Sequence, residues 1–303
     1  MAFTAKDVQA LREKTGCGMM DCKKALVECD GNMDAAVDYL REKGLASQAK
    51  KADRIAAEGT VAVYTANGVG AIVELNSETD FVANGDGFKA LAAEVAEVVA
   101  EKNPADMDAL LAAEKDGMTV EAKVQELFLA IRENIKVRRF DRFEGKVVSY
   151  VHAGGKIGVL VNFETELDAD NEGLVAMGKN VAMQIAAMNP AYLDQASVPA
   201  SVIEKEKEIL IAQMKEDPKM ANKPDAVLGK IVEGKIGKYY KENCLVEQAF
   251  VMDGDVTVGK YVANTAKELG ADIKIASFVR FEKGEGIEKR VDDFAAEVAA
   301  MAK

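Results

Sequence analysis

The sequence predicts an α+β protein in which short helices come first and a duplicated α/β core with antiparallel strand hairpins follows. A helical hairpin and a terminal helix complete the chain. Three observations predict this arrangement. The first 44 residues carry only helical signals, residues 61–100 and 147–187 share one strand–turn–strand–helix pattern, and apolar residues recur at helical spacing after residue 197. With 303 residues, 49% of them hydrophobic, the chain can form two or three compact units.

These patterns divide the chain into five parts. We expect an N-terminal module with its linker at 1–54, a first core half at 55–142, a second core half at 143–196 and 244–283, a helical hairpin at 197–243 and a C-terminal helical segment at 284–303. Strand-like sequence resumes only after the hairpin, at residues 250–251 and 273–281, so the hairpin interrupts the second half.

The N-terminal module reads as three short helices at residues 4–15, 19–28 and 33–43, with a charged helical linker at 45–58. Thr4 and Asp7 have the spacing of a capping box, and glycines break the chain before the second helix. A bundle of this size buries little surface and is typically an interaction module with an exposed apolar patch. We expect Met19 and Met20 to form that patch, because methionine adapts to partner surfaces. The alternative, left open, is that these methionines fill the core.

The core contains one pattern twice. In the first copy, strands at 61–64 and 70–75 flank an Asn67-Gly68 turn, and a helix begins near Phe88. In the second copy, strands at 147–151 and 158–163 flank a Gly154-Gly155 turn, and a helix contains Leu174. The matching order predicts that both copies form the same local structure.

The loop at residues 79–84 lies between a strand and a helix of the first copy, and it contains Thr79, Asp80, Phe81 and Val82. The corresponding loop at 164–169 has no aromatic residue. If the scaffold alone required Phe81, the second copy would need an aromatic residue too. Because loops on a rigid scaffold commonly carry binding groups, we expect Asp80 and Phe81 to contact a partner. The alternative is that these residues cap a helix and that Phe81 folds back onto the core.

The remaining segments are predicted from helical spacing and from glycine and proline signals. We expect one helical stretch from Pro104 to about Asn134, which includes Ile131, and we expect the following Arg138-Arg139 doublet to lie on a solvated face. The hairpin is a candidate docking surface, and its pairing with a second copy of the chain is left open. Residues 284–286 read as a glycine hinge before a terminal helix that carries Phe294 and Val298 on one apolar stripe.

Charge and composition exclude several classes of function. Residues 1–54 carry ten basic and nine acidic side chains, so almost all of the net charge of −12 belongs to the rest of the chain. Such a surface repels phosphate backbones, which argues against direct nucleic-acid binding and favours a protein partner. No apolar run approaches the ~20 residues of a membrane helix, and the first residues lack a secretory signal, so we expect a cytoplasmic protein.

The residues that most enzymes and metal sites require are scarce. The four cysteines form no CxxC pair and His152 is the only histidine, so we expect no metal site and reduced thiols. No GxxxxGK[ST] phosphate loop occurs, and we expect no cofactor. Two alternatives to an exchange or binding factor stay open: an enzyme that uses His152 as a base, and a scaffold that only binds its partner.

Four motifs carry a resemblance to a known family. They read TGCGMMDCKKAL at residues 15–26, ETDFVA at 78–83, KIGVL at 156–160 and RFEKGEGIEK at 280–289. Together, in order and over nearly the whole chain, they resemble bacterial elongation factor Ts. The resemblance implies a ubiquitin-associated-like (UBA-like) N-terminal module, a core of two related halves, a helical hairpin and a C-terminal helix. The chain departs from the family at Arg132, where the family commonly has glycine in an Ile-Gly-Glu sequence.

The resemblance also implies a function, namely guanine nucleotide exchange on elongation factor Tu during translation elongation, without covalent chemistry. Asp80 and Phe81 would act on the magnesium side of the partner's nucleotide site, and His152 on its phosphate-loop side. Other residues of the chain would bind the nucleotide-binding domain. The partner-binding residues implied are Thr79, Asp80, Phe81, Val82, His152, Arg12, Met19, Met20, Lys23, Ile131, Phe294 and Val298.

Overall fold

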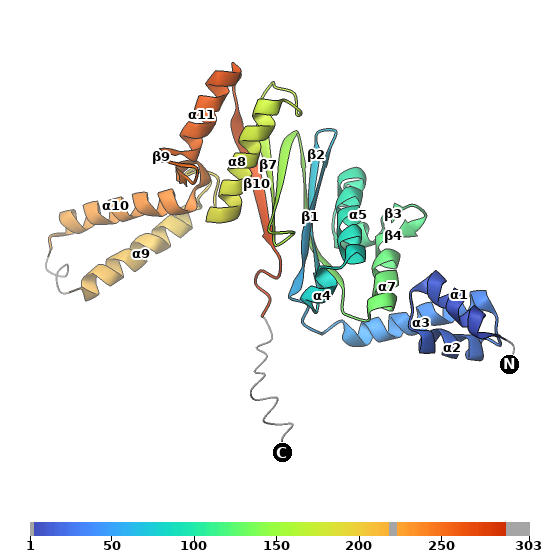
Figure 1. The fold of residues 1–303 in the computed structure, drawn as a ribbon. Helices are drawn as coiled ribbons and strands as arrows, with labels where there is room; N and C mark the ends of the chain where they lie inside the picture. Colours follow the sequence, from blue (N-terminus) through green and yellow to red (C-terminus); the bar gives the residue numbers. More distant parts are fainter. Residues whose placement is uncertain (1–2, 218–222, 289–303) are drawn as a thin grey trace.

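Two antiparallel sheets packed face to face form the centre of the molecule, and helices cover their outer sides (Figure 1). This computed structural model describes residues 3–217 and 223–288. The α+β class, the helical N-terminus and the antiparallel sheets predicted from the sequence are confirmed. The predicted terminal helix, with Phe294 and Val298, lies outside the described residues except for its first positions.

Each sheet has three strands. The first has the order β1-β2-β5, with bounds Glu58–Ala66, Val69–Ser77 and Lys136–Glu144; the second has the order β10-β7-β6, with bounds Lys274–Glu282, Ile157–Glu164 and Lys146–His152. Asn67 and Gly68 connect β1 to β2 with φ values of 51° and 75°. Positive φ at both positions suits a tight hairpin between twisted strands, so this turn sets the register in which Glu58 pairs with Ser77.

Small residues allow the two sheets to approach closely. Val61, Ile72, Leu160 and Phe281 form the buried cluster between them. A Cβ atom on Gly158 of β7 would overlap Val61 of β1, and a Cβ atom on Gly70 of β2 would overlap Val147 of β6. Each sheet therefore supplies one valine and one glycine, and each valine fills the space above the other sheet's glycine.

A substitution at this contact tests how tightly the sheets pack. We expect Gly158→Ala to lower the free energy of unfolding by about 1–3 kcal/mol, because the added methyl group overpacks the interface. Denaturant unfolding followed by circular dichroism measures this loss. Gly234→Ala is the matched control: no atom lies within 4 Å of its added Cβ, and in a helix alanine is favoured over glycine by up to about 1 kcal/mol. Equal stabilities of the two variants would contradict close packing.

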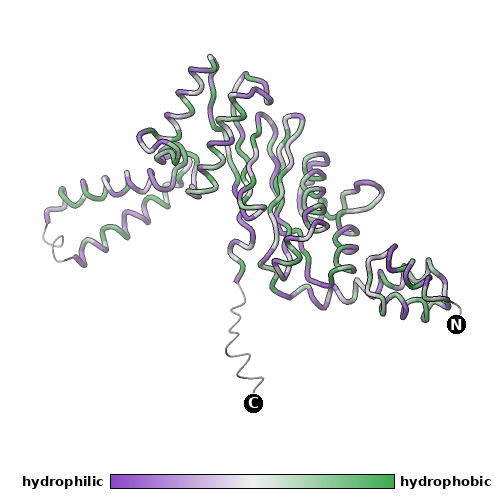
Figure 2. The backbone as a smooth tube through the Cα atoms, in the orientation of Figure 1, coloured by the Kyte–Doolittle hydropathy of each residue, from purple (hydrophilic) through white to green (hydrophobic). Residues whose placement is uncertain are grey.

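One long helix covers the outer face of each sheet. Helix α5 (Asp86–Lys102) packs on the first sheet, and helix α8 (Glu172–Met188) packs on the second. Their buried residues recur at helical spacing: Phe88, Leu91, Val95 and Val99 in α5, and Leu174, Met177, Val181 and Ile185 in α8. Figure 2 shows hydrophobic residues concentrated in the central strands and in the helices that face them.

The N-terminal helices are α1 (Ala5–Thr15), α2 (Met19–Glu28) and α3 (Met33–Lys51). The capping box of Thr4 and Asp7 is formed, and the backbone and side-chain hydrogen bonds from Thr4 hold the pKa of Asp7 below its usual value. The predicted end of the third helix at residue 43 is wrong, because α3 continues into the predicted linker as far as Lys51. The rest of the linker, predicted as helical to residue 58, is irregular up to the start of β1. Gly44 does not end the helix; instead it lets Leu129 of the core approach the backbone.

The stretch between α5 and β5 differs from the predicted continuous helix. It contains α6 (Met107–Ala112), the short strands β3 (Glu114–Lys115) and β4 (Met118–Thr119), and α7 (Val120–Ile131). Asp116 and Gly117, with φ of 56° and 79°, form the tight turn that breaks the helix. Strand β5 follows α7 and was not predicted.

The hairpin and the last part of the second half follow α8. Helices α9 (Ala200–Glu216) and α10 (Asp225–Asn243) run side by side in opposite directions and project from the core (Figure 1). They pack through Leu210, Met214, Val232 and Ile236. The chain returns to the second sheet through η1 (Leu245–Glu247), β8 (Ala249–Phe250), β9 (Asp253–Thr257) and α11 (Val258–Leu269).

Candidate partner-binding site

The segment predicted as a loop forms the short helix α4 (Asp80–Ala83), which begins directly after β2. The Thr79 side chain caps it by accepting a hydrogen bond from the Val82 backbone nitrogen at 3.4 Å. Val82 is only 7% exposed and belongs to the core of the first half, so it anchors the helix from inside. Phe81 is 87% exposed and Asp80 is exposed too. The alternative in which Phe81 folds onto the core is therefore wrong.

Glu133 fixes the start of α4, a role that no sequence pattern predicted. Its carboxylate accepts hydrogen bonds from the Thr79 backbone nitrogen at 3.0 Å and from the Thr79 hydroxyl at 2.7 Å. The Ser77 hydroxyl donates to the Thr79 carbonyl at 3.0 Å. Glu133 lies 54 positions from Thr79 in the sequence, and no local pattern marks such a contact.

The second half has no counterpart of α4. Residues 165–171 form turns and irregular backbone, and α8 begins after Asn171, whose side chain accepts a hydrogen bond from Leu174 at 3.1 Å. The two halves thus share their sheets and long helices but differ at the position where the first half presents Asp80 and Phe81.

His152 lies at the same end of the core as α4. It ends β6, is exposed, and its Nδ1 lies 2.9 Å from the Tyr150 hydroxyl. The turn that follows contacts the first sheet, because the Val61 backbone nitrogen donates to the Gly155 carbonyl at 2.8 Å. Val61 is near the start of β1, which pairs with the end of β2, and α4 follows β2 directly. We call this end of the two sheets the α4 end of the core.

The chain also leaves the second sheet at the α4 end. The Lys283 backbone nitrogen donates to the Lys156 carbonyl at 2.9 Å, and the Gly284 nitrogen donates to the Glu74 carboxylate at 2.7 Å. A Cβ atom on Gly284 would overlap the Ala57 carbonyl, and its φ is +70°. Gly284 is therefore fixed by packing and hydrogen bonding, and the predicted hinge is wrong at this residue.

The carboxylate of Glu74 is completely buried and organises this region. It accepts hydrogen bonds from Arg138 Nη1 at 3.0 Å and from Arg139 Nε at 2.6 Å. The expectation that the arginine doublet lies on a solvated face is wrong, because both guanidinium groups point to Glu74 and to the backbone of residues 282 and 285. A pair of neighbouring arginines in a charged strand gave no signal of a buried partner.

The predicted surface of the N-terminal module is exposed. Met19 and Met20 are 44% and 72% exposed at the start of α2, so the alternative that they fill the core is wrong. Arg12 and Lys23 are exposed as well. Ile131, in contrast, is half-buried and packs against the core of the first half. Cys22 lies below this surface, where burial raises the pKa of its thiol.

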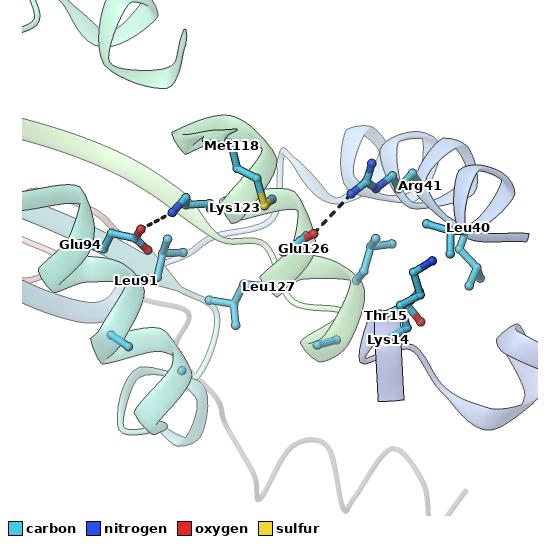
Figure 3. A pocket seen from close by; sticks show the side chains of 15 residues that line it. Lys14, Thr15, Leu40, Arg41, Leu91, Glu94, Met118, Lys123, Glu126 and Leu127 are labelled. Carbon is cyan, nitrogen blue, oxygen red and sulfur yellow. Dashed lines mark hydrogen bonds and ion pairs between the residues drawn. The ribbon is translucent and has the colours of Figure 1, made fainter. Parts of the chain in front are cut away.

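A cleft of about 600 Å³ separates the module from the core (Figure 3). Leu40 of α3 and Leu91 and Leu127 of the core line it. Two ion pairs flank these apolar groups: Arg41 with Glu126, at 3.5 Å across the cleft, and Lys123 with Glu94 within the core.

The described residues contain no group of three or more side chains suited to hold a metal ion. None of the helices in the described part of the chain combines the length and apolarity needed to cross a membrane. An α+β fold that exposes a carboxylate and a phenylalanine on the anchored α4, and a methionine pair on α2, is typical of a protein-binding factor.

The chain is similar to one family of known proteins. Residues 78–285 match the family model described as elongation factor TS. The chain is 50% identical to elongation factor Ts of Syntrophotalea carbinolica over 308 aligned residues that cover 100% of both chains, and 50% identical to that of Clostridium perfringens with 99% of both covered. It is 48% identical to that of Nitratiruptor sp., again with 100% of both covered.

The chain belongs to the elongation factor Ts family. Membership confirms the predicted assignment to translation elongation and the prediction that the protein is a nucleotide exchange factor and not an enzyme.

Proposed function

We propose that this chain releases GDP from elongation factor Tu by inserting α4 beside the partner's nucleotide site, where Asp80 and Phe81 disturb the magnesium and phosphate groups. One observation carries the proposal: Phe81 is 87% exposed although the next two residues are buried. A large apolar side chain held in water by a rigid helix is placed for a contact with another molecule.

Linkage gives the physical basis. A factor that binds the nucleotide-free partner more tightly than the GDP-bound partner weakens GDP binding by the same factor. A thousandfold effect needs about 4 kcal/mol of coupling. Burial of Phe81 supplies about 1.5–3 kcal/mol. Displacement of the magnesium ion supplies more, because such an ion is the largest local charge at a phosphate site.

The anchoring of α4 supports this role. Because Thr79 is held by Glu133 and Val82 is buried, the backbone of α4 has little freedom to lose when Phe81 enters a partner, and the main loss is that of the Phe81 side chain itself. More of the binding free energy is then available to oppose nucleotide binding.

Other surfaces would bind the same partner. His152 would contact the phosphate-loop side, and Arg12, Met19, Met20 and Lys23 would contact the nucleotide-binding domain. The terminal segment with Phe294 and Val298 would add a further contact, since the chain leaves the second sheet at the α4 end. We infer also that the five-part division of the chain, with a UBA-like module and two related halves, applies to this protein.

The hairpin has a separate proposed role in self-association. Ile209 and Ile211 on α9 and Val227 on α10 are exposed large hydrophobic residues. Association through them would leave the α4 end of the core free.

A stopped-flow experiment tests the proposed function. Elongation factor Tu loaded with fluorescent GDP is mixed with excess unlabelled GDP, with and without this chain, and the fluorescence decay is recorded. We expect the chain to accelerate the decay without consuming nucleotide. An unchanged decay with a stable complex would favour the scaffold, and turnover of nucleotide by the chain alone would favour an enzyme that uses His152.

A further inference from the structure

Arg132 ends α7 in a backbone conformation that suits glycine better than arginine. Its φ and ψ are 66° and 23°, and its nitrogen donates to the Phe128 carbonyl at 2.7 Å. A side chain in this left-handed region costs conformational energy that glycine avoids. The Arg132 side chain makes an interaction at this position that glycine could not make.

That interaction reaches the N-terminal module. Arg132 Nη2 lies 2.8 Å from Oδ2 of Asp21. Asp21 is part of α2 and directly follows Met20 in the sequence. The backbone carbonyl of Arg132 accepts a hydrogen bond from the Lys51 ammonium group at the end of α3. One residue of the core thus holds two helices of the module.

The two residues that follow Arg132 hold α4 and the linker. Glu133 binds Thr79 at the start of α4, as described above. The Asn134 side chain donates to the carbonyls of Ala52 and Arg54 at 3.2 and 2.8 Å. Residues 132–134 therefore connect the module, the linker and α4 within three consecutive positions.

The module also packs against α7 of the core through α1 and α3. Leu129 of α7 enters the module's own hydrophobic cluster next to Gly44, and Ala130 lies 3.1 Å from the place of a Cβ on Gly16. The cleft in Figure 3 opens beside this contact, and the exposed ion pair of Arg41 with Glu126 crosses it. These contacts hold α1 and α3 against α7, whereas the pair of Arg132 with Asp21 adds a separate polar contact to α2.

We propose that Arg132 is a positioning residue, which orients the Met19–Met20 surface relative to α4 so that one partner meets both at once. This inference rests on the proposed function. Two binding surfaces held at a fixed separation bind together at high effective concentration, and that advantage falls when one of them can rotate. Arg132 supplies the fixation without touching the partner.

Arg132→Gly gives the sharpest test, because it relieves the backbone conformation while it removes the ion pair. Distances are measured by electron spin resonance between labels introduced as non-canonical amino acids at Lys24 and Asn84. The wild-type chain is expected to give a narrow distribution and the variant a broader one, with no loss of melting temperature. We expect the concentration of chain that half-saturates GDP release to rise about twofold to fivefold, with the maximal rate unchanged.

Two further variants separate orientation from other effects. The exchanged pair Asp21→Arg with Arg132→Asp restores the ion pair and is expected to restore both the narrow distribution and the half-saturating concentration. Lys14→Ala removes an equal charge from a pair with Asp34, at 3.2 Å, that lies wholly within the module, and it is expected to change neither quantity.

Either an unchanged distance distribution or an unchanged half-saturating concentration in Arg132→Gly would overturn the inference. If the wild-type chain does not accelerate GDP release, the proposed function fails instead. The distance measurement on the free chain then still shows whether Arg132 orients the module.

Discussion

Phe81→Ala is expected to slow stimulated GDP release by about tenfold to a hundredfold, because the variant loses the burial of one phenylalanine in the exchange complex. The effect on the affinity for elongation factor Tu should be smaller, since the other surfaces of the chain still bind. Release is measured with fluorescent GDP, and affinity by titration of the nucleotide-free partner. The fold should not change, because a side chain that is 87% exposed contributes little to stability.

Met252→Ala provides the control for Phe81. Met252 is also an exposed large hydrophobic residue, but it lies in the turn between β8 and β9 of the second half. Its truncation should leave release unchanged. Equal losses of release and affinity in Phe81→Ala would show that the ring contributes to binding in general and does not act on the nucleotide site.

Glu74→Ala is expected to lower the free energy of unfolding by about 3–5 kcal/mol, because Arg138 and Arg139 would lose the buried carboxylate that neutralises them. The Gly284 nitrogen would lose its acceptor as well, so the start of the terminal segment should become less protected. Denaturant unfolding measures the first effect, and hydrogen exchange of the Gly284 amide measures the second.

An exposed ion pair provides the comparison for Glu74. Glu242 lies 3.4 Å from Lys238 on α10, and the carboxylate side chain is 61% exposed. Glu242→Ala should cost less than about 0.5 kcal/mol. A loss of less than about 1 kcal/mol in Glu74→Ala would mean that the two arginines find other partners or water at little cost.

The parts of the fold that sequence patterns predicted are those with regular burial. The apolar runs at 70–75 and 158–163 become the central strands β2 and β7, because both faces of these strands are covered. Strand β5 escaped prediction because its arginines face Glu74, and the burial of Glu74 depends on the folded arrangement. The turn at Asp116-Gly117 was not predicted, because apolar residues recur at helical spacing on both sides of it.

The candidate site, too, could be predicted only in part from the sequence. Comparison of the two halves singled out Phe81, because a residue present in one copy and missing from the other cannot be explained by the shared scaffold. Comparison of the halves could not find Glu133. Arg132 stood out as a departure from the family pattern, but its role could not be predicted. Their roles depend on contacts with Thr79 and Asp21, which are 54 and 111 positions away and come close only in the folded chain.

The matched glycines and valines of the sheet interface have a consequence for each half taken alone. Val61 of the first sheet fits the gap at Gly158, and Val147 of the second fits the gap at Gly70. Each sheet face thus carries both parts of the contact, a valine and a glycine gap that accepts a valine. Such self-complementarity is the hallmark of a two-fold symmetric dimer. An excised half, expressed as its own polypeptide, would therefore present a surface suited to bind a second copy, as though a homodimer had been joined into one molecule.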